Sequence, residues 1–477
     1  MTQTPRGPGR AVAWVSASQI GRIVLQILSV SVLAHLLSPS DFGLMAMALV
    51  ATGFIGIFKD LGIGAAIVRS RSTELSALSS LFWTVVVFTA ALALVLVAAA
   101  PILGALFSEV RVVDLTRVTA VGIVAAGIGI VPKATLERDL RFRPVAVAEL
   151  SGAALGAAAG IVMAVSHAGV WSLVGQYLVG AFATSLAVWR VSAFRPQLMW
   201  RAGDATTAVK FGLGLYGFNV VNYFARNADN LLLGIYAGSS QLGPYSLSYS
   251  LMMLPIQAVS QVAGRVLFPT LTLHRDNLDD LRARYLNAVS LTATLAFPMS
   301  AGLGLTAATL VPVMFGPHWT EAIALVQLLS VVALQQSIGF LVGSIYLAMG
   351  RTRLMFAWGI ASSSLVVLGF VVGLRWGALG VAASYLATTS ILAVPLHAIP
   401  LRLIGLRLTS LVTAVLRPAA CTGVMAIAVS GITWRVAPYL ADIALFACQI
   451  LVGIVSYVAA SLLINRTTFR SLRVSLS

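Results

Sequence analysis

Residues 80–107 have the sequence SLFWTVVVFTAALALVLVAAAPILGALF, and no charged side chain interrupts them. The apolar residues are continuous instead of alternating with polar ones, which favours a helix over a strand. A stretch of about twenty apolar residues is long enough to cross the hydrocarbon core of a bilayer as a helix. Because lipid offers the backbone no hydrogen-bond partners, this stretch predicts a transmembrane helix.

The rest of the chain has the same character. It contains 477 residues, of which 59% are hydrophobic and 10% charged, whereas soluble domains have about 25% charged residues. Apolar stretches recur from end to end and predict an all-α, polytopic integral membrane protein with about fourteen transmembrane helices. The predicted spans are 14–37, 43–68, 80–107, 115–132, 145–165, 169–189, 210–237, 242–270, 285–314, 321–348, 354–374, 378–400, 413–433 and 441–464.

The positions of the basic residues predict the orientation of these helices. The net charge is +16, but the arginines lie in short clusters between apolar spans, so nucleic acid is not expected as a partner. One set of alternate connectors is rich in arginine. The opposite set holds Arg111, Arg117, Arg375 and Arg435 and no other basic residue. The positive-inside rule therefore predicts that both termini are cytoplasmic and that the number of spans is even.

A weak internal repeat appears when the chain is compared with itself at an offset near 200 residues. The first predicted helix carries Gln19, Arg22, Gln26 and Ser29, and the seventh carries Asn219, Asn222, Arg226 and Asp229 with the same spacing. Each set forms one polar stripe along a helix face. Paired halves of this kind are common in transporters. They predict a six-helix lobe at 1–195, a second at 205–400, and a terminal helix pair with a cytoplasmic tail at 401–477.

Charged residues inside the predicted spans are the candidate functional residues. Each would cost about 2.5–3.5 kcal/mol at the centre of a bilayer, so we expect them to face a water-filled cavity or one another. The basic candidates outnumber the acidic ones, and this excess favours an anionic cargo such as a diphosphate, which arginine binds through two oxygens. The substrate-binding candidates are Arg22, Lys59, Arg226, Arg265, Asn219, Asn222, Gln19, Gln26 and Gln261, and the candidates for ion pairing or ion coupling are Asp60 and Asp229.

A purely structural role for these charged side chains stays open. Arg226 and Asp229 lie three residues apart on one helix face and are expected to pair. Asp60 shares a face with Gly53, Gly56 and Gly64, where close helix packing is the alternative to an ion site.

The sequence offers little support for an enzyme. No lysine lies in a glycine-rich phosphate loop, and no two histidines have the spacing of a zinc protease. The two cysteines, Cys421 and Cys448, lie in apolar spans and are too few for a disulfide framework. We therefore predict no catalytic residues, no metal and no cofactor.

Two motifs and their later echoes carry a family resemblance. The stretches Leu36-Leu37-Ser38-Pro39-Ser40-Asp41-Phe42-Gly43 and Asp60-Leu61-Gly62-Ile63-Gly64 resemble the opening of Wzx-type oligosaccharide and polysaccharide flippases. These proteins belong to the multidrug/oligosaccharidyl-lipid/polysaccharide exporter superfamily. The stretches Leu242-Gly243-Pro244-Tyr245 and Gly264-Arg265-Val266-Leu267-Phe268-Pro269 are similar to the start of that family's second lobe.

The resemblance implies a two-lobed transporter of the bacterial inner membrane that works by alternating access. Its cargo would be a polyprenyl-diphosphate-linked oligosaccharide, moved for surface polysaccharide biosynthesis. Besides the bilayer and this cargo, a polysaccharide polymerase and glycosyltransferases are the partners implied.

Three alternatives remain at this point. A multidrug or cation antiporter of the same superfamily would line its cavity with acids and aromatic residues. A membrane-embedded glycan polymerase would need a large external loop, and no predicted connector is long enough for one. A scaffold without transport activity would not need charged stripes inside its spans.

Overall fold

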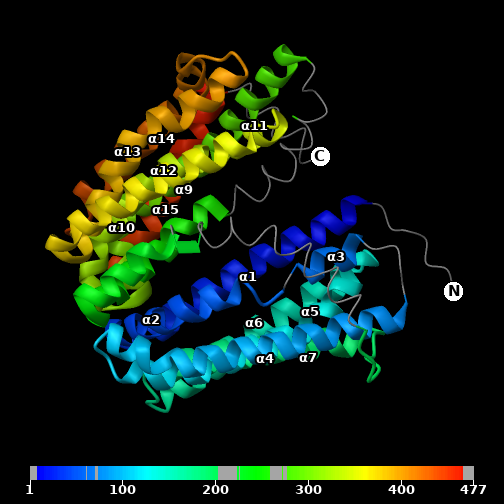
Figure 1. Cartoon of the computed structure of the whole chain (residues 1–477). Coiled ribbons are helices and arrows are strands. Elements are labelled where there is room, and N and C mark those ends of the chain that lie inside the picture. Colours follow the sequence, from blue (N-terminus) through cyan, green and yellow to red (C-terminus); the bar gives the residue numbers. More distant parts are fainter. Residues whose placement is uncertain are drawn as a thin grey trace. The chain divides into compact units, whose positions relative to one another are not determined.

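The computed structural model describes residues 8–60, 62–69, 74–201, 223–224, 226–257, 271 and 277–465, and every element within them is a helix (Figure 1). In this part of the chain, 11 stretches are long and apolar enough to cross a membrane. Two of them, Pro317–Ala348 and Thr352–Leu403, each contain two α-helices. The predicted all-α membrane fold is confirmed, whereas the count of about fourteen helices stays a prediction.

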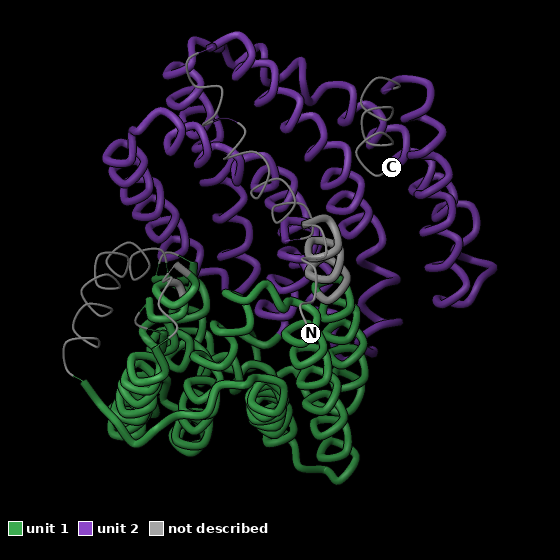
Figure 2. Tube along the Cα trace, turned by 90° about the vertical axis from the view of Figure 1, so that its right-hand side faces the viewer, with its two compact units in different colours: residues 1–243 green, residues 244–477 purple. Residues whose placement is uncertain are grey.

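The chain forms two compact units, Met1–Gly243 and Pro244–Ser477 (Figure 2). The predicted lobes at 1–195 and 205–400 and the terminal part at 401–477 stay a prediction, since residues 202–222 lie outside the described part.

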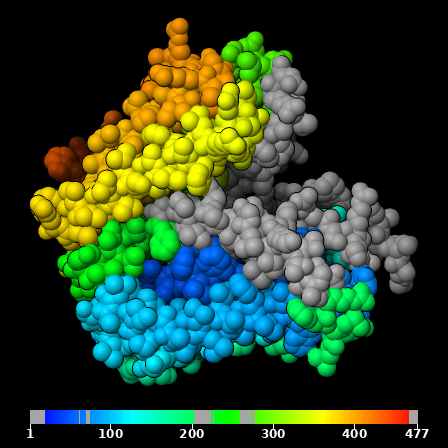
Figure 3. All heavy atoms as spheres, in the orientation of Figure 1, coloured from blue at the N-terminus to red at the C-terminus, as the bar shows by residue number. Residues whose placement is uncertain are grey.

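The first unit is a bundle in which α4 packs on α5, α5 on α7, and α6 on both α7 and α1. Large apolar side chains on α4, such as Val87, Leu94 and Ile102, are exposed, as expected of a surface that faces lipid. In Figure 3 the light-blue spheres of this part of the chain form an open face of the first unit. The helices of this unit are α1 (Pro8–Leu36), α2 (Pro39–Gly56), α3 (Ile63–Arg69), α4 (Leu75–Leu106), α5 (Arg111–Arg138), α6 (Phe142–Val165) and α7 (Trp171–Val191).

A capping box starts α2 at the predicted connector. The Ser38 hydroxyl accepts a hydrogen bond from the Asp41 backbone N–H at 3.2 Å, and the Asp41 carboxylate accepts one from the Ser38 N–H at 3.0 Å. Pro39 occupies the first turn, where its missing N–H costs no hydrogen bond. These residues end one helix and begin the next within the same short motif.

Close packing of α6 on α7 depends on Gly152, Gly156 and Gly160, which are spaced four residues apart along α6. A Cβ atom at Gly152 would lie 1.9 Å from the Thr184 Oγ1, and one at Gly156 would lie 2.6 Å from the Gln176 carbonyl oxygen. Small residues at this spacing let two helix backbones approach inside a membrane.

The predicted single helix at 43–68 is wrong, because α2 ends at Gly56 and α3 begins at Ile63. Residues 57–60 form turns, and Gly62 adopts a φ of +68°, which a right-handed helix cannot contain. The Asp60 carboxylate accepts a hydrogen bond from the Gly64 N–H at 2.8 Å and so satisfies one of the open donors at the start of α3. Hydropathy alone does not detect such an interruption.

Residues 226–257 are helical as well, and Gly238 within them has a φ of +77°. A positive φ interrupts a right-handed helix, so this glycine marks the connector that the sequence predicts at 238–241.

The repeated turns of the first unit contact each other directly. A Cβ atom at Gly43 would lie 1.9 Å from the Ser239 carbonyl oxygen, and a Cβ atom at Gly243 would lie 1.9 Å from the Pro39 carbonyl oxygen. The Ser40 and Ser239 hydroxyls are 2.9 Å apart and share a hydrogen bond. Gly43 and Gly243, which the internal repeat pairs in sequence, are therefore paired in space.

In the second unit, α9 packs on α10, α14 and α15, and α13 packs on α10 and α12. Hydrogen bonds join the last two helices to each other and to α9. The Gln449 amide on α15 donates to the Thr433 hydroxyl on α14 at 2.8 Å and accepts from Thr309 on α9, and the Tyr457 hydroxyl on α15 donates to the Thr294 carbonyl on α9 at 2.6 Å. The elements are α9 (Leu278–Phe315), η1 (Pro317–Trp319), α10 (Thr320–Gly339), α11 (Val342–Ala348), α12 (Thr352–Gly373), η2 (Leu374–Trp376), α13 (Gly377–Leu403), α14 (Leu408–Val436) and α15 (Asp442–Ile464).

Candidate functional site

A polar pocket of about 610 Å³ lies inside the first unit. It is lined by α1, α5, α6 and α7, together with the interruption between α2 and α3. Interrupted helices inside transporters commonly line a binding cavity, because the free backbone groups of the break need a polar environment. The charged side chains that line the pocket are Arg22, Lys59, Asp60, Lys133, Glu137 and Glu149.

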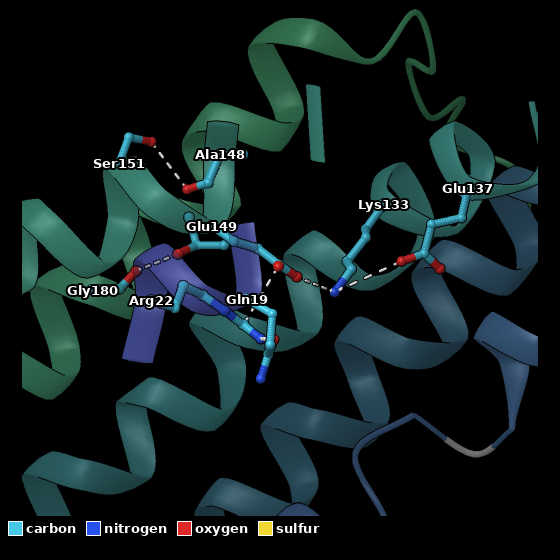
Figure 4. A network of polar contacts seen from close by, with 9 residues as sticks. Gln19, Arg22, Lys133, Glu137, Ala148, Glu149, Ser151 and Gly180 are labelled. Carbon is cyan, nitrogen blue, oxygen red and sulfur yellow. Dashed lines mark hydrogen bonds and ion pairs between the residues drawn. The ribbon is translucent and has the colours of Figure 1, made fainter. Parts of the chain in front are cut away.

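Glu149 is the centre of the polar network in this pocket (Figure 4). One carboxylate oxygen, Oε1, lies 2.6 Å from the Lys133 ammonium on α5, and the other, Oε2, lies 3.3 Å from the Arg22 guanidinium on α1. The Glu149 side chain is 18% exposed, whereas those of Arg22 and Lys133 are 39% and 38% exposed. One carboxylate on α6 thus pairs with two cations from two other helices, and water still reaches both cations.

Lys133 and Arg22 each have further partners. The Lys133 ammonium lies 3.8 Å from the Glu137 carboxylate one helical turn away. The Arg22 guanidinium also donates to the Gln19 side-chain oxygen, as the polar stripe on α1 predicts. Its buried Nε has no hydrogen-bond partner within the described part of the chain. A buried donor without a partner is costly and is a place where a ligand oxygen could bind.

Lys59 and Asp60 come from the interruption between α2 and α3, and both line the pocket. The Asp60 carboxylate accepts a hydrogen bond from the Gly64 N–H. Asp60 therefore stabilises the start of α3 and also places a negative charge at the pocket.

The charges that line this pocket are balanced. Three basic side chains, Arg22, Lys59 and Lys133, face three acidic ones, Asp60, Glu137 and Glu149. The excess of basic charge expected from the sequence stays a prediction, since Arg265 lies outside the described residues. A neutral set of paired charges avoids the large cost of isolated charges in a low-dielectric interior.

None of the other predicted site residues that the structure describes lines this pocket. Gln26 and Arg226 are exposed. Asp229 is buried, with 1% of its surface exposed, and its carboxylate accepts a hydrogen bond from the Asn230 N–H at 2.8 Å. The candidates that lie outside the described residues are Asn219, Asn222, Gln261 and Arg265. Among the described residues, no group of three or more His, Cys, Asp or Glu side chains is arranged to hold a metal ion.

Sequence reasoning singled out neither Glu149 nor Lys133. Lys133 follows the predicted span 115–132 directly, and in the structure it is helical and lines the pocket from α5. The acid that pairs with Arg22 is Glu149, which reaches it from α6 and not from its own helix. The signal was available, since Glu149 falls within the predicted span 145–165 and an acid there is as costly as any other charge in lipid.

A family model described as polysaccharide biosynthesis protein matches residues 32–324 of this chain. The lipopolysaccharide biosynthesis protein WzxC of Escherichia coli is 24% identical over 376 residues, which are 78% of this chain and 76% of WzxC. The succinoglycan biosynthesis transport protein ExoT of Rhizobium meliloti is 28% identical over 313 residues, covering 66% of this chain and 63% of ExoT. The teichuronic acid biosynthesis protein TuaB of Bacillus subtilis is 24% identical over 382 residues, covering 80% and 79%.

Two kinds of solved membrane transporter share the fold. The lipid II flippase MurJ in an inward closed conformation matches with a TM-score of 0.76 at 14% identity, covering 95% of this chain and 99% of MurJ. An inward-facing multidrug resistance transporter of the MATE family matches with a TM-score of 0.64 at 15% identity, covering 86% and 98%. At these identities the similarity concerns the fold alone.

Proposed function

Because this chain belongs to the polysaccharide biosynthesis protein family, we propose that it is a flippase that moves a lipid-linked glycan across the membrane in which it lies. The motifs at residues 36–43 and 242–245 resemble those of such flippases, and the matches to WzxC, ExoT and TuaB bear that resemblance out. The cargo that fits best is an oligosaccharide linked to a polyprenyl diphosphate, delivered to surface polysaccharide biosynthesis.

The observation that carries this proposal is the charged pocket within an otherwise apolar bundle. Ionisable side chains at membrane depth are costly unless they are paired or used. The pocket of about 610 Å³ has room for a charged head group and for sugar hydroxyls. Arg22 and Lys133 supply the donors for a diphosphate, while Tyr177 and Thr184, which also line the pocket, supply partners for hydroxyls.

In the proposed mechanism the protein alternates the side to which its binding site opens. The glycan and diphosphate occupy the polar pocket while the polyprenyl chain stays in lipid, so the polar part never crosses the hydrocarbon core unprotected. The chain acts as a transporter and not as an enzyme. A polysaccharide polymerase and glycosyltransferases act on the same lipid-linked glycan and are its proposed partners.

We propose that this multi-pass protein lies in the bacterial inner membrane with both termini in the cytoplasm. The alternation of arginine-rich connectors supports this orientation. A green fluorescent protein fused to the C-terminus should fluoresce, and an alkaline phosphatase fused there should be inactive. An active phosphatase at that position would reverse the orientation.

Deletion of the gene in its native bacterium tests the function. We expect loss of one surface polysaccharide and accumulation of its lipid-linked repeat unit on the cytoplasmic side. Unchanged surface polysaccharides in the deletion strain would count against the proposal.

A second candidate function is export of cationic compounds. One observation favours it: three carboxylates, Asp60, Glu137 and Glu149, line the pocket. An antiporter of this kind would lower the accumulation of cationic dyes in cells that overproduce it, whereas a glycan flippase would leave dye accumulation unchanged.

A further inference from the structure

Glu149 occupies the place that an anionic ligand of the pocket would need. Its two carboxylate oxygens contact Lys133 and Arg22 at 2.6 and 3.3 Å, so the two strongest anion-binding side chains of the pocket are already engaged. A second anion has to compete with this carboxylate for both cations, because like charges repel each other, and it can reach them because the Arg22 and Lys133 side chains are 39% and 38% exposed.

Both cations are arranged so that they can exchange one anion for another. Lys133 keeps a neighbouring acid, Glu137, at 3.8 Å when the Glu149 carboxylate leaves. Arg22 keeps its hydrogen bond to Gln19 and has an unused donor at its buried Nε. A diphosphate presents several oxygens to this pair and can fill the Nε position as well, which a single carboxylate on Glu149 does not do.

We propose that Glu149 is a resident competing anion: the diphosphate of the cargo displaces its carboxylate from Arg22 and Lys133, and the returning carboxylate discharges the cargo. This inference rests on the proposed function. Displacement makes the pocket selective, because a diphosphate carries more charge than a carboxylate and can replace it, whereas an acidic sugar with one carboxylate gains nothing by the exchange. Return of Glu149 prevents the two cations from holding the diphosphate too tightly for release.

The test uses the full-length protein in lipid nanodiscs and geranylgeranyl diphosphate as the probe. Replacing Glu149 by glutamine removes the charge but keeps a side chain of the same size. We expect Glu149→Gln to bind the probe roughly tenfold more tightly than the unmodified protein. In proteoliposomes we expect its transport of the lipid-linked glycan to fall by about the same factor, because release becomes slow.

Two further variants separate this role from a structural one. Glu109→Gln changes the net charge by the same amount as Glu149→Gln, but in the turn between α4 and α5, where Glu109 pairs with Arg111 at 2.9 Å. We expect this control variant to bind the probe and transport the glycan normally. Glu149→Asp keeps a competing charge on a shorter side chain, so its affinity for the probe should lie between those of the unmodified protein and Glu149→Gln. If Glu149 only held the helices together, both Glu149→Gln and Glu149→Asp would weaken binding of the probe.

The outcomes distinguish this inference from the function on which it rests. If the unmodified protein binds the diphosphate and transports the glycan, but Glu149→Gln binds the probe no more tightly, the competing-anion role is wrong and the flippase function stands. If the unmodified protein neither binds the probe nor transports the glycan, the flippase function is wrong and the role of Glu149 falls with it.

Discussion

Arg22 joins the polar stripe of α1 to the pocket of the first unit. Its guanidinium contacts Gln19 on its own helix and Glu149 on α6. The polar stripe predicted Arg22 and Gln19 correctly as neighbours, because residues three apart share a helix face. The contact with Glu149 was not predictable from one sequence, since it depends on which helix packs beside α1.

Replacing Arg22 by alanine should reduce glycan transport roughly tenfold or more, because a charge-assisted hydrogen bond to the cargo contributes about 1.5–3 kcal/mol. Glu149 keeps Lys133 as a partner, so the protein should still insert and fold. The same change at Arg226, on the matched stripe, is expected to impair export as well. The readout is surface polysaccharide per molecule of protein in the membrane.

Arg117→Ala is the matched control, because Arg117 forms a solvent-exposed pair with Asp114 at 3.4 Å near the start of α5. Exposed pairs of this kind contribute little, and we expect normal transport from this variant. Normal transport by both Arg22→Ala and Arg226→Ala would mean that these side chains do not bind the cargo.

At the level of elements, the first residues of α2 pack against the segment from Ser239 to Gly243 so closely that neither Gly43 nor Gly243 has room for a side chain. In Gly43→Ala the new Cβ would lie 1.9 Å from the Ser239 carbonyl oxygen, so one backbone has to move. Overpacking of this kind typically costs about 1–3 kcal/mol, and the thermal unfolding temperature of the purified protein should fall. Gly243→Ala is expected to behave in the same way.

Gly56→Ala on the same helix is the control. No atom lies within 4 Å of a Cβ placed there, so its unfolding temperature should be unchanged or slightly higher. Equal unfolding temperatures for Gly43→Ala and Gly56→Ala would show that the two turns do not meet as closely as the structure has them.

Gln449 is one of the side chains that link the two terminal helices to each other and to α9. Gln449→Leu removes the hydrogen bonds to Thr309 and Thr433, and interhelical hydrogen bonds in membranes contribute about 0.6 kcal/mol each, with a maximum of about 1.7. We therefore expect a modest loss of thermal stability. Leu451→Ala changes a side chain of α15 that is 64% exposed and should have no effect. If Leu451→Ala lowers the thermal stability as much as Gln449→Leu does, the Gln449 hydrogen bonds do not contribute measurably to stability.

The sequence predicted most helices of the described part to within a few residues, because their apolar runs end at short polar turns. The predicted span 441–464, for example, is helix Asp442–Ile464 in the structure. The interruption at residues 57–62 escaped prediction for a physical reason. It rests on the left-handed conformation of Gly62 and on a hydrogen bond to the Asp60 carboxylate, and neither changes the average hydropathy of the segment.

At the scale of the whole molecule, the separation of apolar surface from polar interior connects the sequence to the function. Helices such as α4 carry exposed apolar side chains, while six charged side chains of the first unit line one pocket. The charge asymmetry of the connectors supports the orientation, and the family match supports the cargo class. The identity of the glycan is carried by no residue pattern, because hydroxyl-binding side chains such as threonine and tyrosine serve many sugars.

Transport of a defined polyprenyl-diphosphate-linked oligosaccharide in proteoliposomes shows directly whether this protein is a flippase for lipid-linked glycans. A fluorescent label on the sugar, quenched by an impermeant reagent in the outer solution, reports the side on which it lies, with and without an ion gradient. We predict that the protein moves the sugar much faster than protein-free liposomes do, and that Arg22→Ala slows this movement. If the sugar moves no faster than in protein-free liposomes, while the same vesicles do export a cationic dye, the protein is not a flippase for this glycan.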